Sequence, residues 1–391
     1  MFSITKEEYM LRTSRIQEKM AENDMDAVIC YGDSGSYDNL RYLTTYWPIF
    51  EVGGVLIGRK GAPLVLIGGE SPDFGAMTPF GMDSVRVCHD FGHACDDELF
   101  WTGVRYFSLR ELFDEVTDGK GVRRLGIGDP STIPHKLYKS VEHACLPGAE
   151  IIDFENVLID LRMQRSQNEL ALIRKGCEIS EKAFDTVLGI VTPEHTELEM
   201  EGLLNAQLYK DGAEGPGFPT ACFSGRHSRC GIGRNTHNPL GRNTIVNVGL
   251  GCHYGGYASS YGRPFMFGRM PQKMKDQMKF LLDLHERLIC DWVRPGLTTG
   301  EIYDKYCKEF QKNGYGIPPA CASHGIGVFE GDLPSFSLNN PTVILPGMAV
   351  AGDHFFRLDD GEYGFRFEDC YAVTETGTDL FTRNHWECIE L

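Results

Sequence analysis

Short apolar runs separated by polar segments mark the first part of the chain. The runs have the length of buried strands, and they lie at 27–31, 55–57, 63–67, 124–128 and 150–152. A capping box, Thr5-x-x-Glu8, opens a helical pattern ahead of the first run. Because strands that alternate with helices are typical of an α/β domain, we predict such a domain at residues 1–158.

The second part, residues 159–391, contains a faint internal repeat. The pattern V-x-P-x-x-T-x-x-E occurs twice, and its threonines, Thr196 and Thr298, stand 102 residues apart. Each Thr-x-x-Glu caps a new helix, and a strand-rich segment follows each time, at 219–267 and 321–379. Helix, cap, helix and strands repeated in register predict two α+β halves related by a pseudo-twofold axis, with a cleft between them.

The stretch 245–265, IVNVGLGCHYGGYASSYGRPF, has the pattern of a buried β-hairpin. An apolar run leads into a turn with Gly251, Gly255 and Gly256, and small and aromatic residues continue beyond it. The stretch contains no carboxylate. Its position inside the first repeat half makes that absence important for any catalytic assignment.

Charge and cysteine usage narrow the function classes. The net charge of -17 argues against nucleic acids and anionic membranes as partners. We see neither a signal peptide nor an apolar run near the roughly 20 residues that cross a bilayer. The 13 cysteines form no CxxC pair, so zinc and disulfide frameworks lack support. We predict a reduced, cytoplasmic protein that acts on a small molecule.

Six motifs carry a resemblance to a known superfamily. In chain order they are RSQNELALIRKGCEIS, GAEGPGFPT, VGLGCHYGGYASSYGRPF, SHGIGVFEGDLP, LPGMAV and GFRFEDCYAVTETG. They resemble successive landmarks of the "pita-bread" superfamily, which contains methionine aminopeptidase, prolidase, aminopeptidase P and creatinase. The resemblance covers nearly the whole chain. It implies an α/β N-terminal domain plus an α+β pita-bread C-terminal domain with a pseudo-twofold internal repeat.

The peptidases of this superfamily hold two metal ions with two aspartates, one histidine and two glutamates. Laid on this chain, the pattern puts Gly249 and Ser260 at the aspartates, and His324, Asp353 and Glu368 at the other positions. Bridging carboxylates offset the repulsion between two nearby cations, but glycine offers no ligand and a serine hydroxyl is a poor one. The resemblance therefore implies a site without metal or other cofactor.

The segment THNPLGRN, at 236–243, resembles the creatinase A-H-N-P segment around its catalytic histidine. Creatinase and its relatives hydrolyse C–N bonds without metal. The resemblance assigns His237 as general base and then acid, with Glu368 as the second catalytic residue. Gly262 stands where creatinase has another substrate-binding acid, which argues against creatine itself. We predict metal-independent hydrolysis of a C–N bond (amidine, urea or amide) in a small polar, amino-acid-like substrate.

Five further side chains are assigned to substrate binding. His324, Asp353 and Ser260 follow from their places in the superfamily pattern. Arg226 belongs to the arginine-rich segment SGRHSRCGIGRN, where it would pair with a carboxylate. His385 corresponds loosely to a C-terminal histidine of creatinase.

Each assignment has a structural alternative. The arginine-rich segment could be a solvated loop, and Asp353 or Glu368 could form an ion pair with Arg357 or Arg366. Asp369 is expected on the opposite side of its strand from Glu368 and is interpreted as structural.

The resemblance also implies a homodimer, since in creatinase-type dimers the partner's N-terminal domain closes the active site. The matching segment is TTYWPIFEV, at 44–52. Tyr46, Trp47 and Phe50 are then exposed anchors that contribute to the partner's site. The alternative is that they belong to the domain core.

Two other functions remain open. One is an Xaa-Pro dipeptidase- or aminopeptidase-like metallohydrolase, or a lyase, that uses a single divalent metal ion at His324, Asp353 and Glu368. The other is a non-catalytic relative that binds peptides or partners in the old cleft.

Overall fold

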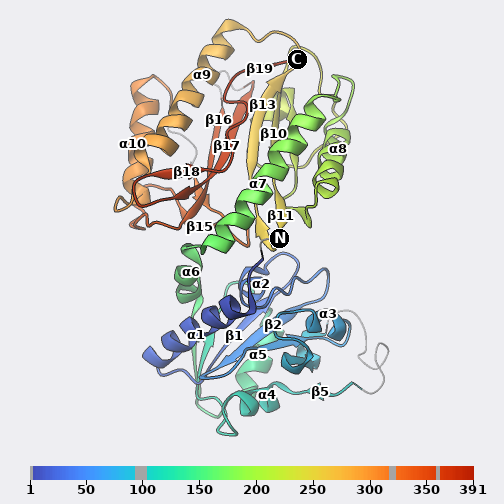
Figure 1. The fold of residues 1–391 in the computed structure, drawn as a ribbon, viewed down its shortest axis with the longest axis vertical. Coiled ribbons are helices and arrows are strands. Elements are labelled where there is room, and N and C mark those ends of the chain that lie inside the picture. The colour runs from blue at the N-terminus through green and yellow to red at the C-terminus, as the bar shows by residue number, and fades with distance from the viewer. Residues whose placement is uncertain (1–2, 93–103, 317–322, 358–361) are drawn as a thin grey trace. The chain divides into compact units, whose positions relative to one another are not determined.

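The computed structural model describes residues 3–92, 104–316, 323–357 and 362–391 (Figure 1). The chain divides into two compact units, one of Ile4–Arg162 and one that includes Met163–Leu391. The boundary expected after residue 158 lies inside helix α6, Glu155–Met163, a few residues before the observed division.

The N-terminal unit is built on a mixed sheet. In its described part the strand order is β5-β4-β3-β2-β1-β6-β7. The strands are β1 Ala27–Gly32, β2 Gly53–Gly58, β3 Leu64–Ile67, β4 Val85–Cys88, β5 Tyr106–Phe107, β6 Arg124–Ile127 and β7 Glu150–Asp153. The helices are α1 Lys6–Glu22, α2 Asp38–Thr44, α3 Pro72–Ala76, α4 Leu109–Val116, α5 His135–Ala144 and α6. Only β2 runs antiparallel to its described neighbours, which makes this the predicted α/β domain.

A buried polar network ties this unit together around Asp129, just behind β6. Its carboxylate accepts hydrogen bonds from the Tyr31 N–H at 2.9 Å and from Asn39 Nδ2 at 2.7 Å. The side-chain oxygen of Asn39 accepts in turn from Arg162 of α6, and Arg162 pairs with Asp38 at 2.6 Å. These bonds fix α2 and α6 against the sheet.

The second unit contains the larger sheet, with the order β15-β14-β16-β17-β13-β10-β9 in the described residues. Its strands are β9 Ala221–Ser224, β10 Ile245–Leu250, β13 Tyr261–Met266, β14 His324–Gly325, β15 Asp332–Ser335, β16 Ala349–Arg357 and β17 Gly364–Val373, with β18 Thr378–Leu380 and β19 Ile389–Glu390 at its side. A small second sheet joins β8 Gly215–Pro216, β11 Cys252–Tyr254 and β12 Tyr257–Ala258. The helices are α7 Gln167–Leu188, α8 Glu197–Lys210, α9 Gln272–Glu286, the π-helical turn η5 Arg287–Trp292 and α10 Thr299–Lys312, and η4 is a 3-10 turn at Gly225–Arg229.

The predicted internal repeat is confirmed in the second unit. Thr196 caps α8 and Thr298 caps α10, and each hydroxyl accepts the N–H of its glutamate at 3.1 Å. The strand order also repeats, because β9-β10-β13 is followed across the middle of the sheet by β17-β16-β14 (Figure 1). One half packs α7 and α8 on β10 and β13, and the other packs α9, η5 and α10 on β16 and β17.

The expected hairpin spans β10 to β13. Its tip turns through Gly255 and Gly256, whose φ angles of 57° and 88° lie in the left-handed region that glycine adopts without strain. Asp369 of β17 pairs with Arg263 of the hairpin strand β13 at 2.7 Å, and both side chains are fully buried. Its predicted structural role is confirmed.

Two further sequence expectations concern the whole chain. Every cysteine in the described part is free of disulfide bonds, and most are buried. Within that same part, no helix combines the length and the apolar character that crossing a bilayer requires.

The substitution Asp129→Asn tests the buried network of the N-terminal unit. Burial and the charge of Asp38 raise the pKa of Asp129 to about 7. The folded chain thus keeps a proton on Asp129 that the unfolded chain releases at about pH 4. The stability that this bound proton contributes is lost as the pH rises from 4 through 7. Between pH 5 and 8, urea titration should show the free energy of unfolding falling by about 2–3 kcal/mol more in the parent protein than in the variant. Equal falls in both proteins would contradict the raised pKa.

Candidate functional site

Strand register places the expected site positions in one row across the larger sheet. Gly249 of β10 lies opposite Gly262 of β13. Gly262 lies opposite Glu368 of β17, and Glu368 lies opposite Asp353 of β16. Side chains at paired positions of neighbouring strands share a face, so the two acids and the two glycines face the same side of the sheet.

Asp353 is bound by an arginine on the neighbouring strand. Arg366 donates from Nε to Asp353 Oδ1 at 2.9 Å and from Nη2 to Oδ2 at 2.6 Å, a bidentate pair. Burial disfavours the charged acid, but the guanidinium outweighs it and lowers the pKa of Asp353. The structural ion pair with Arg366 is therefore realised, and both oxygens of Asp353 are engaged.

Glu368 is fully buried at the centre of the row. Its Oε1 accepts a hydrogen bond from Ser260 at 2.5 Å, while no described residue forms a hydrogen bond with its Oε2. The nearest cation on that side, Arg366 Nε, is 3.8 Å away. Burial and the charge of Asp353 raise the pKa of Glu368 to about 8. A buried carboxylate oxygen without a partner is costly, so this atom indicates a binding role.

His324 and Glu330 complete a cluster beside Glu368. His324 Nε2 lies 3.3 Å from Glu330 Oε1 and 4.0 Å from Glu368 Oε1. The other ring nitrogen, Nδ1, donates to the Gly325 carbonyl at 3.0 Å, which leaves the lone pair of neutral His324 on Nε2. Although burial opposes it, the charges of Glu330 and Glu368 raise the pKa of His324.

These three side chains form a candidate metal centre. One ligand atom from each of His324, Glu330 and Glu368 lies within 4.8 Å of the others. One imidazole and two carboxylates are a ligand set that suits a divalent transition metal. Sequence reasoning missed Glu330, because the superfamily pattern assigns it no role. The available signal was its place in the glycine-flanked segment that follows His324.

Three predicted residues form no hydrogen bond or ion pair with this cluster in the described part of the chain. His237 is exposed and acts electrostatically on Glu199, near the start of α8. Arg226 is exposed on η4. His385 binds Asp185 of α7 at 2.6 Å. The main charges that act on Glu368 come instead from Asp353, Arg366, Glu330 and His324. The proposed roles of His237, Arg226 and His385 stay predictions.

The segment expected to reach a partner subunit is only partly exposed. Phe50 is 62% exposed, whereas Tyr46 is 1% exposed. Tyr46 bonds to buried Glu51 at 3.1 Å and to Ser71 at 2.7 Å, so it belongs to the core of its own unit and is not an exposed anchor. Trp47 is half-buried against the Arg41 guanidinium, 3.8 Å from the ring centre.

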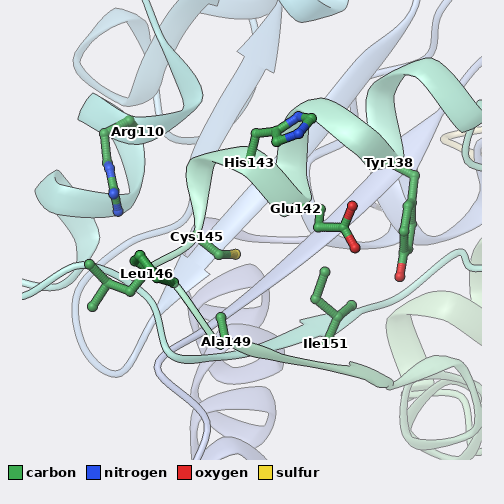
Figure 2. A pocket seen from close by; sticks show the side chains of 10 residues that line it. Arg110, Tyr138, Glu142, His143, Cys145, Leu146, Ala149 and Ile151 are labelled. Atoms are coloured by element: carbon green, nitrogen blue, oxygen red, sulfur yellow. The ribbon is translucent and has the colours of Figure 1, made fainter.

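A cavity of about 530 Å³ lies within the N-terminal unit (Figure 2). Arg110 of α4, Glu142 and His143 of α5 and Ile151 of β7 line it, among others. Its lining includes none of the predicted site residues. We therefore place the candidate active site at the row of the larger sheet that contains Asp353 and Glu368.

Comparison with known proteins shows similarity to dipeptidases. The chain is 28% identical over 285 residues to an Xaa-Pro dipeptidase of Pyrococcus furiosus, covering 71% of this chain and 79% of that protein. A second Xaa-Pro dipeptidase, from Pyrococcus horikoshii, is 26% identical and covers 69% of this chain and 76% of its own. The solved Xaa-Pro dipeptidase from Bacillus anthracis superposes with a TM-score of 0.82 at 23% identity, over 98% of this chain and all of that one.

These similarities correct the predicted activity. The creatinase-like reading rested on the HNP segment around His237 and on the missing aspartates, whereas these relatives are named as dipeptidases. The prediction of a creatinase-like, metal-independent hydrolase is therefore wrong. Its coarser part, a hydrolase that acts on C–N bonds, agrees with the peptidase relatives.

Two family models match consecutive parts of the chain. Residues 12–164 match the creatinase/prolidase N-terminal domain and residues 171–375 match metallopeptidase family M24. The two-domain pita-bread architecture is thereby confirmed. The prediction of no cofactor is wrong, because the chain matches a metallopeptidase family. That prediction gave most weight to the lost aspartates, and its single-metal alternative did not include Glu330, whose carboxylate lies next to His324 and Glu368. Since the second match spans more than half of the sequence, the chain belongs to metallopeptidase family M24.

Proposed function

We propose that this chain hydrolyses the peptide bond of short peptides, of the Xaa-Pro type named for its relatives, with one divalent metal ion held by His324, Glu330 and Glu368. The observation that carries the proposal is the buried Oε2 of Glu368, which has no hydrogen-bond partner among the described residues. Glu368 also belongs to the cluster with His324 and Glu330, in which one ligand atom of each residue lies close enough to share one ion.

The donor set of this cluster fits such an ion. When bound, a divalent metal acts as a Lewis acid toward a peptide carbonyl and makes water a better nucleophile at neutral pH. The protein holds the ligands in place beforehand. Ser260 fixes one oxygen of Glu368 at 2.5 Å, and the Gly325 carbonyl orients the ring of His324. Such supporting contacts keep the ligand atoms aimed at one point.

Asp353 is not included in this ligand set. The sequence-based alternative with a single metal used His324, Asp353 and Glu368. Because Arg366 pairs with Asp353 in bidentate fashion and offsets its charge, and because Glu330 shares the cluster of ligand atoms with His324 and Glu368, we assign the third position to Glu330. Arg226 remains our candidate for the carboxylate end of the peptide, since arginine pairs with carboxylates in bidentate fashion.

A homodimer is part of the proposal. Phe50, 62% exposed in a segment of otherwise more buried aromatic residues, is the side chain best placed to contact a second copy. Large exposed aromatic residues often mark such contacts.

Hydrolysis of Xaa-Pro dipeptides should depend on the metal. We expect the protein saturated with Mn²⁺ to release proline from Ala-Pro and Met-Pro, and the rate to fall at least about 100-fold after chelation and dialysis. Proline release measured by a ninhydrin assay reports the rate, and adding Mn²⁺ back should restore it. No turnover of any dipeptide with Mn²⁺, Co²⁺ or Zn²⁺ present would refute the activity.

Glu330→Gln tests the ligand that the superfamily pattern does not contain. The substitution removes one anionic ligand while keeping the side-chain shape, so the dissociation constant for Mn²⁺ should rise at least about 10-fold. Titration followed by electron paramagnetic resonance measures this constant without substrate. Glu375→Gln, at an exposed position near the end of β17, is the matched control and should bind as the parent does. Unchanged affinity in Glu330→Gln would remove Glu330 from the site.

His237→Ala tests whether the exposed histidine moves a proton in the reaction. We retain His237 as the candidate general base, so kcat should fall about 100-fold or more, with Mn²⁺ affinity unchanged. A parent-like kcat would show that His237 has no role in proton transfer.

A further inference from the structure

The side chain of Arg366 lies in a trough that two glycines create. A Cβ atom added at Gly262 would come within 3.3 Å of Arg366 Cγ, and one added at Gly249 within 3.1 Å of its Nη1. Both distances are shorter than ordinary van der Waals contacts. The stem of Arg366 therefore passes over Gly262, and its guanidinium lies next to Gly249.

Gly249 and Ser260 are the positions at which the superfamily's peptidases carry their two aspartates. Gly249 has no side chain that could bind a metal ion, and the guanidinium of Arg366 lies next to it. The Ser260 hydroxyl is already bonded to Glu368 at 2.5 Å. Asp353, which stands at a glutamate position of that pattern, is held by Arg366 at 2.6 and 2.9 Å. The residues present therefore do not fit a second metal ion.

Charge balance gives the same result. The row and its neighbours hold three carboxylates, Asp353, Glu330 and Glu368, and the guanidinium of Arg366 offsets one of them. With all three carboxylates ionised, as metal binding requires, one divalent ion would neutralise the remaining two charges. A second ion would leave a net charge of about +2 in a buried site, where like charges a few ångströms apart repel strongly.

We infer that the guanidinium of Arg366, held by Asp353 in the space left by Gly249 and Gly262, takes the place of one of the two metal ions, so that the site binds a single divalent ion. The inference rests on the proposed function only in that it uses the same cluster of His324, Glu330 and Glu368. It concerns the number of ions and the role of Arg366, and it holds for any substrate.

The number of bound ions is the first test. The full-length protein is freed of metal with a chelator, dialysed against excess Mn²⁺ and analysed by inductively coupled plasma mass spectrometry. We expect one Mn²⁺ per chain. Two ions per chain, or none, would overturn the inference.

Substitutions of Arg366 form the second test. Arg366→Met keeps the stem, removes the charge and frees Asp353, so Mn²⁺ should bind at least about 10-fold more tightly or in a second equivalent. Arg366→Lys keeps a positive charge and should still bind one ion, which covers the case in which Arg366→Met does not fold. Arg357→Met, on the same pair of strands but exposed, is the matched control and should behave as the parent. Loss of Mn²⁺ from a folded Arg366→Met variant would overturn the inference.

The two proposals fail in different ways. One bound Mn²⁺ without dipeptide hydrolysis would refute the proposed function and leave the role of Arg366 intact. Dipeptide hydrolysis with two bound Mn²⁺ ions would overturn the role of Arg366 and the single-ion part of the proposed function, and it would leave the proposed peptidase activity intact.

Discussion

The bidentate pair between Arg366 and Asp353 is the interaction on which the rest of the site depends. It places a permanent positive charge in a largely buried row of the sheet and offsets the charge of one carboxylate. An unpaired buried charge costs several kcal/mol, so each partner requires the other. What remains beside the pair is Glu368, whose Oε2 has no hydrogen-bond partner in the described part of the chain, next to His324 and Glu330.

The two faces of β17 show how neighbouring charges set the pKa of two equally buried acids. Glu368 and Asp369 are adjacent and both fully buried. Burial raises the pKa of each, but Arg263 and His285 outweigh it for Asp369 and lower its pKa. Glu368 faces other acids as well as Arg366, and its pKa rises to about 8. One carboxylate thus holds the fold together, and its neighbour stays available for a ligand.

Sequence patterns predicted the scaffold well because the scaffold depends on local rules. The caps at Thr196 and Thr298 and the glycine turn of the hairpin follow from short-range chemistry, and the structure contains all of them. The pairing of Asp353 with Arg366 was one of several alternatives, because it depends on which strands become neighbours. Glu330 was missed for a related reason, since its closeness to Glu368 arises only when the segment after His324 folds over the sheet. The expected exposure of Tyr46 is wrong, because aromatic residues occur in cores and in interfaces and their pattern does not separate the two.

Retention of the fold with a changed ligand set has a physical explanation in the hairpin. The side chains through which β10 and β13 contribute to the core, such as Val246, Val248 and Phe265, alternate with the site positions and face the helices. Replacing an aspartate by Gly249 on the other face leaves this packing intact. The architecture of family M24 is therefore compatible with different numbers of metal ligands. Similarity over the whole chain establishes the fold, and the number of ions follows from the few side chains that face the row.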